Sequence, residues 1–187
     1  MKTIIKLFVI ITFTLIIFSC TRTYPFVKRS AGFPPADSVY ARYAVLDFDY
    51  HGHNINKKIA DRAADQLSNE LYSTLSLPVA ERSIVRAAQK KFKTTKNTQI
   101  TQNEIAKIAE ETQSDFIVLG TLRLLGSVEN VFEITENEIE LNVRFIDVQT
   151  GELVCIIQEK RYSDASLESI IHQSVLRSVD RLKMELK

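Results

Sequence analysis

The side chains best suited to metal or proton chemistry lie between residues 47 and 53. Asp47 and Asp49 are followed there by His51 and His53, which flank a single glycine. A His-x-His pair after a strand can bind zinc, but a zinc site takes three or four protein ligands. No further ligand stands at a recognisable spacing, so we interpret the pair as part of a solvated turn.

The other acids and histidines do not form a catalytic set either. Asp61 and Asp65 are four residues apart on the polar side of an expected helix, which is the usual position of solvated charges. His172 lies off the main apolar stripe of the last expected helix. The sequence has no glycine-rich phosphate loop and no Gly-x-Ser-x-Gly element. We therefore expect no enzyme activity, no cofactor and no bound metal.

A basic segment raises the question of nucleic-acid binding. Lys90, Lys91, Lys93 and Lys96 surround Phe92 in a stretch without periodicity. The formal net charge is only +1, however, and falls to −1 without the N-terminal segment and its two lysines. A nucleic-acid-binding domain would carry a clear basic excess. We expect a solvated loop and no nucleic-acid partner, with an anionic surface or an acidic partner as the alternative.

The two cysteines, Cys20 and Cys155, are too few for a disulfide framework. Cys155 lies in the apolar run LVCII, which is typical of a strand, and we expect it to be a small buried thiol. Cys20 stands at the end of an N-terminal apolar segment, where a different chemistry applies.

This N-terminal segment has a charged start and an apolar continuation. Lys2 and Lys6 come first, and the run Leu7–Phe18 is broken only by threonines. A helix of about twelve residues spans about 18 Å, whereas the hydrocarbon core of a bilayer is about 30 Å thick. The apolar run is therefore too short for a permanent transmembrane helix, and residues 1–19 have the features of a signal peptide.

The end of the segment resembles a bacterial lipobox. Its sequence is Ile17-Phe18-Ser19-Cys20, whereas an ordinary signal cleavage site would have a small residue in place of Ile17. The resemblance implies cleavage between Ser19 and Cys20 and attachment of acyl chains to Cys20. Each buried CH2 contributes about 0.8 kcal/mol, so that three chains hold a protein durably on a membrane. An uncleaved N-terminal anchor is the alternative.

Residues 20–41 are expected to form a tether carrying the lipidated cysteine. They contain three prolines and show neither helical nor strand periodicity. Thr21, rather than an aspartate, follows Cys20, and in many Gram-negative bacteria this allows a lipoprotein to reach the outer membrane. We therefore expect a domain held on the periplasmic side of the outer membrane.

Residues 42–187 carry the periodicity of a folded domain. The run 43–48 is typical of a strand and ends in the turn-forming sequence DYHGHN. Asn54 or Asn56 can cap the helix that follows, in which apolar residues recur every three or four positions as far as residue 75.

The middle of the domain predicts two further helices. A short extended segment, 77–81, precedes a helix that Ser83 can cap, and residues 90–99 are expected to be a polar loop. Thr101 and Glu104 then form a capping box, in which each side chain can satisfy a free backbone donor of the other residue.

The last part predicts strands and a final helix. Residues 116–120 are typical of a buried central strand, and the alternation in 139–148 predicts a hairpin with 152–162 around Thr150-Gly151. An amphipathic helix over 166–187 follows. The expected order is β-α-β-α-α-β-β-β-α, an α/β (α+β) domain with a small mixed sheet and helices packed on it.

Several of these stretches together resemble the periplasmic domain of the CsgG-like lipoproteins, the family of the curli secretion channel. They are AVLDF, PVAER, SDFIVLGTL and LNVRFIDVQTGELV, in this order within residues 42–185. Related domains occur in penicillin-binding-protein activators and in flagellar outer-membrane lipoproteins. The resemblance implies a fold similar to an anticodon-binding domain, which agrees with the order of elements above.

The secretion channels of that family carry two further hairpin segments. Residues 124–138 leave little room for one of them, and from Glu152 the chain continues through a single strand into its last helix. We therefore expect the periplasmic domain of the family without its pore.

The sequence thus indicates an outer-membrane-anchored periplasmic lipoprotein that acts as a protein-interaction and assembly domain in cell-envelope machinery. Its expected partners are the membrane, through lipid on Cys20, and envelope proteins, with copies of itself as one option. The roles of curli or secretion accessory, peptidoglycan-synthase activator and flagellar lipoprotein remain open. A pore-forming secretion subunit and an enzyme using His51 and His53 are the rival classes.

Overall fold

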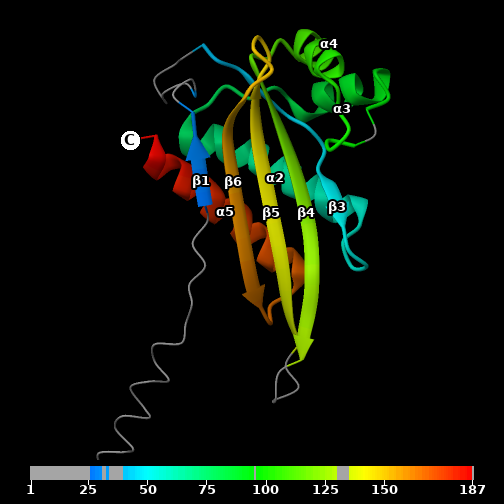
Figure 1. The fold of residues 1–187 in the computed structure, drawn as a ribbon, viewed down its shortest axis with the longest axis vertical. Coiled ribbons are helices and arrows are strands. Elements are labelled where there is room, and N and C mark those ends of the chain that lie inside the picture. Colours follow the sequence, from blue (N-terminus) through cyan, green and yellow to red (C-terminus); the bar gives the residue numbers. More distant parts are fainter. Residues whose placement is uncertain (1–25, 31–32, 34–39, 95, 130–134, 187) are drawn as a thin grey trace, which may run out of the picture.

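A mixed sheet of six strands forms the centre of the domain (Figure 1). The computed structural model describes residues 26–30, 33, 40–94, 96–129 and 135–186, so the predicted signal peptide, Ser19 and Cys20 lie outside the described residues. The elements are β1 (Phe26–Arg29), β2 (Tyr43–Val45), β3 (Asp49–His51), α2 (Lys57–Leu75), α3 (Arg82–Lys91), α4 (Gln102–Thr112), β4 (Phe116–Glu129), β5 (Thr135–Asp147), β6 (Leu153–Ser163) and α5 (Leu167–Glu185). The strand order is β1-β6-β5-β4-β2, and β3 also pairs with β4.

Helices cover both faces of this sheet, as the alternation along β4 demonstrates. Val118 belongs to one core with α2 and α5, whereas its neighbours Ile117 and Leu119 belong to a second core with α3 and α4. Successive side chains of a strand point to opposite faces, so the two helix pairs lie on opposite sides. The predicted fold class, a mixed sheet with helices packed on it, is confirmed. Within the described ranges, none of the helices has the length and apolar character needed to cross a membrane.

The start, the end and the buried face of α2 agree with the sequence prediction. The Asn56 side chain accepts a hydrogen bond from the N–H of Ile59 at 3.1 Å and caps the helix. The helix ends at Ser76, which has a left-handed φ of 56°. Its buried face consists of Ala60, Ala63, Ala64, Leu67, Ser68, Leu71 and Leu75.

Two other local predictions are confirmed. Thr101 and Glu104 form the capping box at the start of α4, with the Glu104 carboxylate accepting the N–H of Thr101 at 2.8 Å. β5 and β6 form the expected hairpin, in which Val143 lies opposite Ile157. Each of these features joins residues that are close in sequence, which is why a sequence pattern predicts them.

The expected tether contributes an edge strand to the sheet. β1 pairs antiparallel with β6, so that Arg29 lies opposite Cys155. Val27 packs against the core, and Phe33 is buried with its ring centroid 5.4 Å from that of Phe145. The prediction of a tether without strands is wrong at these positions, because a strand of four residues is too short to show a period.

The predicted turn after β2 also contains a strand. β3 pairs in parallel with residues 121–123 of β4, although DYHGHN is rich in turn-forming residues. The strand exists because β4 offers it a partner that the local sequence does not reveal. The extended segment 77–81, in contrast, forms only one bridge, between Val79 and Tyr43.

The boundaries of α3 differ from the prediction as well. The N-cap is Glu81, and Ser83 lies inside the helix, where its hydroxyl donates to the Glu81 carboxylate at 2.7 Å. Lys90 and Lys91 belong to the last turn of α3 rather than to a loop. A lysine pair in the last turn suits the negative end of the helix dipole.

The hairpin of β4 and β5 is longer than expected. The sequence predicts a strand over 116–120 with a continuation as far as residue 124, whereas β4 extends to Glu129 and pairs with β5 as far as Thr135. In Figure 1 the two strands run side by side to the end of the sheet opposite to α3 and α4. Antiparallel pairing with β5 supports the strand beyond its apolar part.

Candidate functional site

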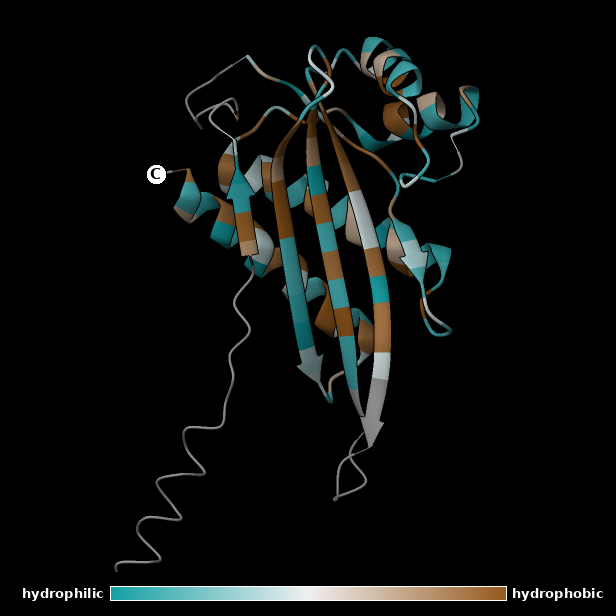
Figure 2. Ribbon diagram, in the orientation of Figure 1, coloured by the Kyte–Doolittle hydropathy of each residue, from teal (hydrophilic) through white to brown (hydrophobic). Residues whose placement is uncertain are grey.

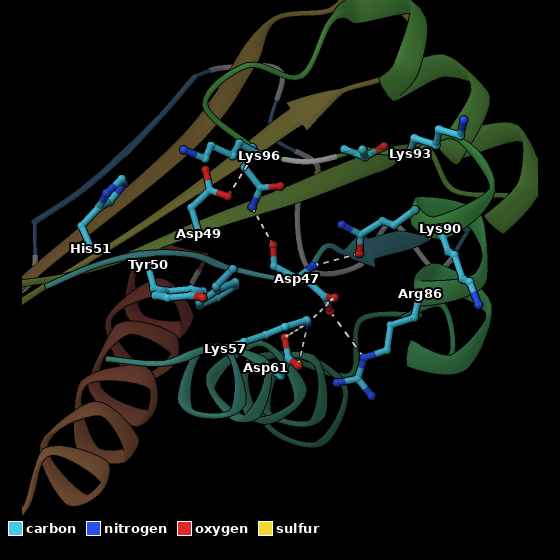
Figure 3. A pocket seen from close by; sticks show the side chains of 14 residues that line it. Asp47, Asp49, Tyr50, His51, Lys57, Asp61, Arg86, Lys90, Lys93 and Lys96 are labelled. Carbon is cyan, nitrogen blue, oxygen red and sulfur yellow. Dashed lines mark hydrogen bonds and ion pairs between the residues drawn. The ribbon is translucent and has the colours of Figure 1, made fainter. Parts of the chain in front are cut away.

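A crevice of about 730 Å³ lies where the chain leaves β2. Residues 47–51 form one side of it, α2 a second side, and α3 with the loop that follows it a third (Figure 3). The titratable side chains that line it are those of Asp47, Asp49, Tyr50, His51, Lys57, Asp61, Arg86, Lys90, Lys93 and Lys96. The structure thus brings most of the residues singled out in the sequence to one place.

Two buried amides form the floor of the crevice. The Gln89 side chain accepts the N–H of Asp47 at 3.0 Å, and the Asn97 side chain donates to the carbonyls of Asp47 and Gly120 at 2.7 and 3.2 Å. Gln89 is 9% exposed and Asn97 3%. Backbone groups of Asp47 and Gly120, which lie between the pairing of β2 and that of β3 with β4, are satisfied in this way, because buried polar groups need partners.

Asp49 holds the loop after α3 against β3. One of its carboxylate oxygens accepts the N–H of Asn97 at 3.1 Å, and the other accepts the N–H of Thr98 at 3.0 Å. The carboxylate therefore has a structural role. The sequence prediction of a merely solvated loop over 90–99 is wrong for Asn97, whose burial no local pattern indicates.

Arg82 is the centre of an ion-pair network beside the crevice. Its side chain is 12% exposed, and its guanidinium donates to the carboxylates of Asp47 and Asp65 and to the carbonyl of Val45. Arg86 also pairs with Asp65, at 2.6 Å between Nη2 and Oδ1. Partial burial raises the pKa of Asp65, but the hydrogen bonds from Arg82 and Arg86 outweigh this, and the pKa lies below its usual value.

The two helix aspartates are therefore more than solvated charges. Asp65 connects α2 to α3 through Arg82, and Asp61 forms an ion pair with Lys57 at 2.7 Å. The hydrogen bond from Lys57 to Asp61 raises the pKa of the lysine. The prediction that both acids occupy an ordinary polar face is thus wrong for Asp65, because its partners come from another helix.

Three lysines at the crevice have no acidic partner among the described residues. Lys90, Lys93 and Lys96 are exposed and take part in none of the ion pairs found there. Five cationic side chains line the crevice against three carboxylates, and all three carboxylates are engaged by the contacts above. The crevice therefore presents uncompensated positive charge to solvent.

The histidines do not come together. His51 is exposed on β3 and lines the crevice, His53 is exposed after it, and His172 is exposed on α5. Within the ranges that the structure describes, no three histidine, cysteine, aspartate or glutamate side chains are arranged to hold a metal ion. Cys155 is 1% exposed, as predicted, and burial raises the pKa of its thiol to about 12.

The second face of the sheet is only partly covered by helices. Near α3 and α4 it carries Ile117 and Leu119, but farther along β4 it becomes polar, with Arg123 facing Glu140 of β5 at 3.8 Å. Figure 2 shows the corresponding change along the strands, from hydrophobic brown to alternating teal. This half of the face is a polar surface formed by β4 and β5, where Asn142 is among the lining residues of a pocket.

No family model and no curated protein matches the sequence. Solved structures do match. The PelC dodecamer from Paraburkholderia phytofirmans is 13% identical, with a TM-score of 0.52, over 82% of this chain and 96% of that chain. Lipoprotein GNA1162 from Neisseria meningitidis is 12% identical, with a TM-score of 0.52, over 77% and 99%.

The chain is thus similar in fold to one lipoprotein, GNA1162. The C-terminal domain of LpoB from Salmonella enterica is a further match, with 14% identity and a TM-score of 0.48 over 72% of this chain and 87% of that chain. At these identities the likeness is one of fold. The finer resemblance to CsgG-like proteins stays a prediction from the sequence.

Proposed function

We propose that this protein is a lipoprotein of the bacterial cell envelope, anchored in the outer membrane through Cys20 and facing the periplasm. Its folded domain acts by binding other proteins, including copies of itself, and neither catalyses a reaction nor forms a pore. The observation that carries this proposal is the similarity in fold to PelC and GNA1162, which extends over most of this chain and nearly the whole of theirs.

Each of these two proteins supports a different part of the proposal. GNA1162 is a lipoprotein, which fits the lipobox Ile17-Phe18-Ser19-Cys20 and the signal peptide before it. PelC is a dodecamer, which makes self-association a reasonable mode of action for a domain of this fold. The polar, partly uncovered face of the sheet and the crevice are two solvent-facing surfaces suited to such contacts.

The carboxylates at the crevice support a role without catalysis. Asp49 accepts two backbone N–H groups, and Asp47 accepts hydrogen bonds from Arg82 and Arg86. A general base or a metal ligand needs an oxygen free to reach the reacting group. These acids instead hold β3, α3 and the following loop together.

The choice of a particular envelope system rests on the sequence resemblance to the CsgG-like family. This resemblance favours an accessory of curli production or of another secretion system. An activator of a peptidoglycan synthase and a flagellar outer-membrane lipoprotein are the alternatives in the same class.

Membrane anchoring is tested by labelling cells with radioactive palmitate and separating their inner and outer membranes. The wild-type protein should carry label and occur in the outer membrane, whereas C20S should remain unlabelled. Label on C20S would contradict the anchor assignment, and wild-type protein confined to the inner membrane would contradict the localisation.

Self-association and the absence of a pore are tested with the lipidated protein purified in detergent. Native mass spectrometry should show a defined oligomer, and planar bilayers containing the protein should show no conductance. A monomer at all concentrations would contradict self-association. Channel conductance would support the pore-forming alternative, and one zinc per chain in metal analysis would support an enzyme that uses His51 and His53.

A further inference from the structure

Strand β1 brings the folded domain close to the lipid proposed at Cys20. Phe26 is the first residue of β1, and the five residues 21–25 stand between it and Cys20. A chain extends at most about 3.6 Å per residue, so the six steps from Cys20 to Phe26 span at most about 22 Å. The tether expected from the sequence, residues 20–41, would reach much farther. The domain is therefore held within a short distance of its anchor.

The strand is firmly joined to the rest of the sheet. Its residues pair with 155–158 of β6, and the N–H of Ser30 after it donates to the carbonyl of Val154 at 2.8 Å. Val27 packs against the core. This attachment determines which part of the domain lies nearest to Cys20, namely the edge of the sheet formed by β1 and β6.

Aromatic and basic side chains share one face of this edge. Phe26 lies opposite Gln158 of β6, and opposite residues of an antiparallel pair point to the same face. Successive residues alternate between the faces, so the same side also carries Lys28, Lys160 and Tyr162. Phe26 is 54% exposed and Tyr162 51%, and both lysines are exposed. Phe26, Lys28, Lys160 and Tyr162 are called the β1–β6 surface below.

The β1–β6 surface belongs to the half of the sheet that α3 and α4 leave uncovered. Gln158 lines the same pocket of this half as Asn142. Figure 1 looks onto this face, where β5 and β6 pass in front of α2 and α5, while α3 and α4 lie at one end of the sheet. A flat partner can therefore approach the strands without meeting a helix.

The neighbouring carboxylates of β5 are engaged by other groups. Glu138 accepts a hydrogen bond from the Tyr162 hydroxyl at 2.7 Å, and Glu140 lies 3.8 Å from Arg123. Lys28, in contrast, lies opposite Ile156 and takes part in no ion pair among the described residues. Its charge is therefore available to an anionic partner.

A phospholipid surface has the chemistry that these side chains recognise. Aromatic rings are enriched at the boundary between the hydrocarbon core of a membrane and water. Lysines close to a membrane are attracted by anionic headgroups. An acyl anchor and basic residues also reinforce each other, since the anchor keeps the residues near the headgroups.

We propose that the β1–β6 surface lies on the phospholipid surface that holds the acyl chains of Cys20. Phe26 and Tyr162 enter the headgroup layer, and Lys28 and Lys160 contact anionic headgroups. The domain then has a fixed orientation on the membrane, and the crevice beside β3, at the other edge of the sheet, stays open to protein partners. This inference rests on the lipid anchor in the proposed function and adds the surface that faces the membrane.

Tryptophan fluorescence of the full-length lipidated protein tests the orientation, because the sequence contains no tryptophan. The variant F26W is incorporated into vesicles of phosphatidylethanolamine and phosphatidylglycerol whose acyl chains carry bromine, a short-range quencher. It should lose about half of its emission, since an interfacial apolar side chain lies where headgroups and acyl chains meet. Y162W reports on the same surface from β6 and should be quenched as well, which guards against a local defect in F26W.

The variant Y50W is the matched control. Tyr50 is 42% exposed on β3, and four strand spacings of about 4.8 Å separate β3 from β1 across the sheet. Y50W should therefore keep its emission in the same vesicles.

A second pair of variants tests the contribution of charge. F26W/K28E should be quenched less than F26W, because phosphatidylglycerol repels the glutamate. F26W/K58E makes the same charge change at an exposed position on α2 and should be quenched like F26W. Equal quenching of F26W/K28E and F26W would contradict the contact with anionic headgroups.

Flotation of the vesicles separates this inference from the proposed function. Wild-type protein that neither carries palmitate nor floats with the vesicles would lack the anchor, and the proposed function would be wrong together with this inference. If the protein floats but F26W and Y162W are quenched no more than Y50W, the anchor stands and the proposed orientation is overturned.

Discussion

The Asp49 carboxylate accepts the backbone N–H of Asn97, 48 residues later in the chain, at 3.1 Å. The Asn97 side chain in turn donates to the carbonyl of Asp47, so that the loop after α3 and the chain around β3 hold each other in place. The wall and the floor of the crevice are thus formed by one set of hydrogen bonds.

Replacing this carboxylate should loosen the loop. In D49A the N–H groups of Asn97 and Thr98 lose their acceptor, and an unsatisfied polar group costs about 1–3 kcal/mol. We expect a decrease of that order in the free energy of unfolding, measured with urea, and faster hydrogen exchange at both amides. D164A removes an exposed acid before α5 and should change neither quantity. Equal effects of the two substitutions would contradict the structural role of Asp49.

Gly120 should not tolerate a side chain. A Cβ at this position would lie 2.1 Å from the ring of Phe48, which is one of the residues that line the crevice. Overpacking of this kind costs about 1–3 kcal/mol, so G120A should unfold at a lower urea concentration. Gly126 provides the matched control on the same strand, because the Cβ of an alanine there would meet no atom within 4 Å. The idea fails if G120A and G126A unfold alike.

Asp65 should contribute to acid sensitivity. Its pKa in the folded protein lies below its unfolded value of about 3.9, so the stabilisation is present above that pH and is lost as the pH falls through the folded pKa. At pH 7 the wild type should therefore be more stable than D65N, and the difference should shrink on acidification from pH 6 to pH 3. Urea titrations at several pH values measure it, and a difference independent of pH would contradict the ion-pair explanation.

Glu159 should give stability the opposite pH dependence to that given by Asp65. The residue is fully buried on β6, and its Oε1 lies 3.7 Å from Arg177 without a hydrogen bond. Burial raises its pKa, against the opposing effect of Arg177 and Arg161. The contribution of Glu159 to the free energy of unfolding is therefore fully present below the unfolded pKa of about 4.3. It is lost as the pH rises through the pKa of the folded protein.

The substitution E159Q removes this charge and keeps the shape of the side chain. The melting temperature of E159Q should exceed that of the wild type at pH 7, and the two should converge near pH 4. R177M should have the reverse effect at pH 7, because it removes the cation nearest to the buried carboxylate. A melting temperature of E159Q below that of the wild type at pH 7 would mean that attraction to Arg177 outweighs burial.

The sequence by itself determined the features that depend on neighbours within a few positions. Asn56 caps α2, Thr101 and Glu104 form the capping box of α4, and the alternation of β5 predicts its hairpin with β6. Helix periodicity and the strand pattern were also sufficient for the fold class. The signal for lipid attachment at Cys20 is likewise local, and it stays a prediction.

Tertiary structure alone decided which polar side chains lie together. Arg82 and Asp47 are 35 residues apart, and Asn97 and Asp47 are 50 residues apart. Aspartate, asparagine and lysine occur in solvated turns as well as in buried contacts. The residue types alone therefore did not show which of these side chains would be buried or paired. Strands β1 and β3 have the same origin, because short strands exist only where a neighbouring strand supplies hydrogen-bond partners. The crevice is formed by such contacts between residues far apart in the sequence. Tertiary packing, and not local propensity, therefore determines where its residues lie.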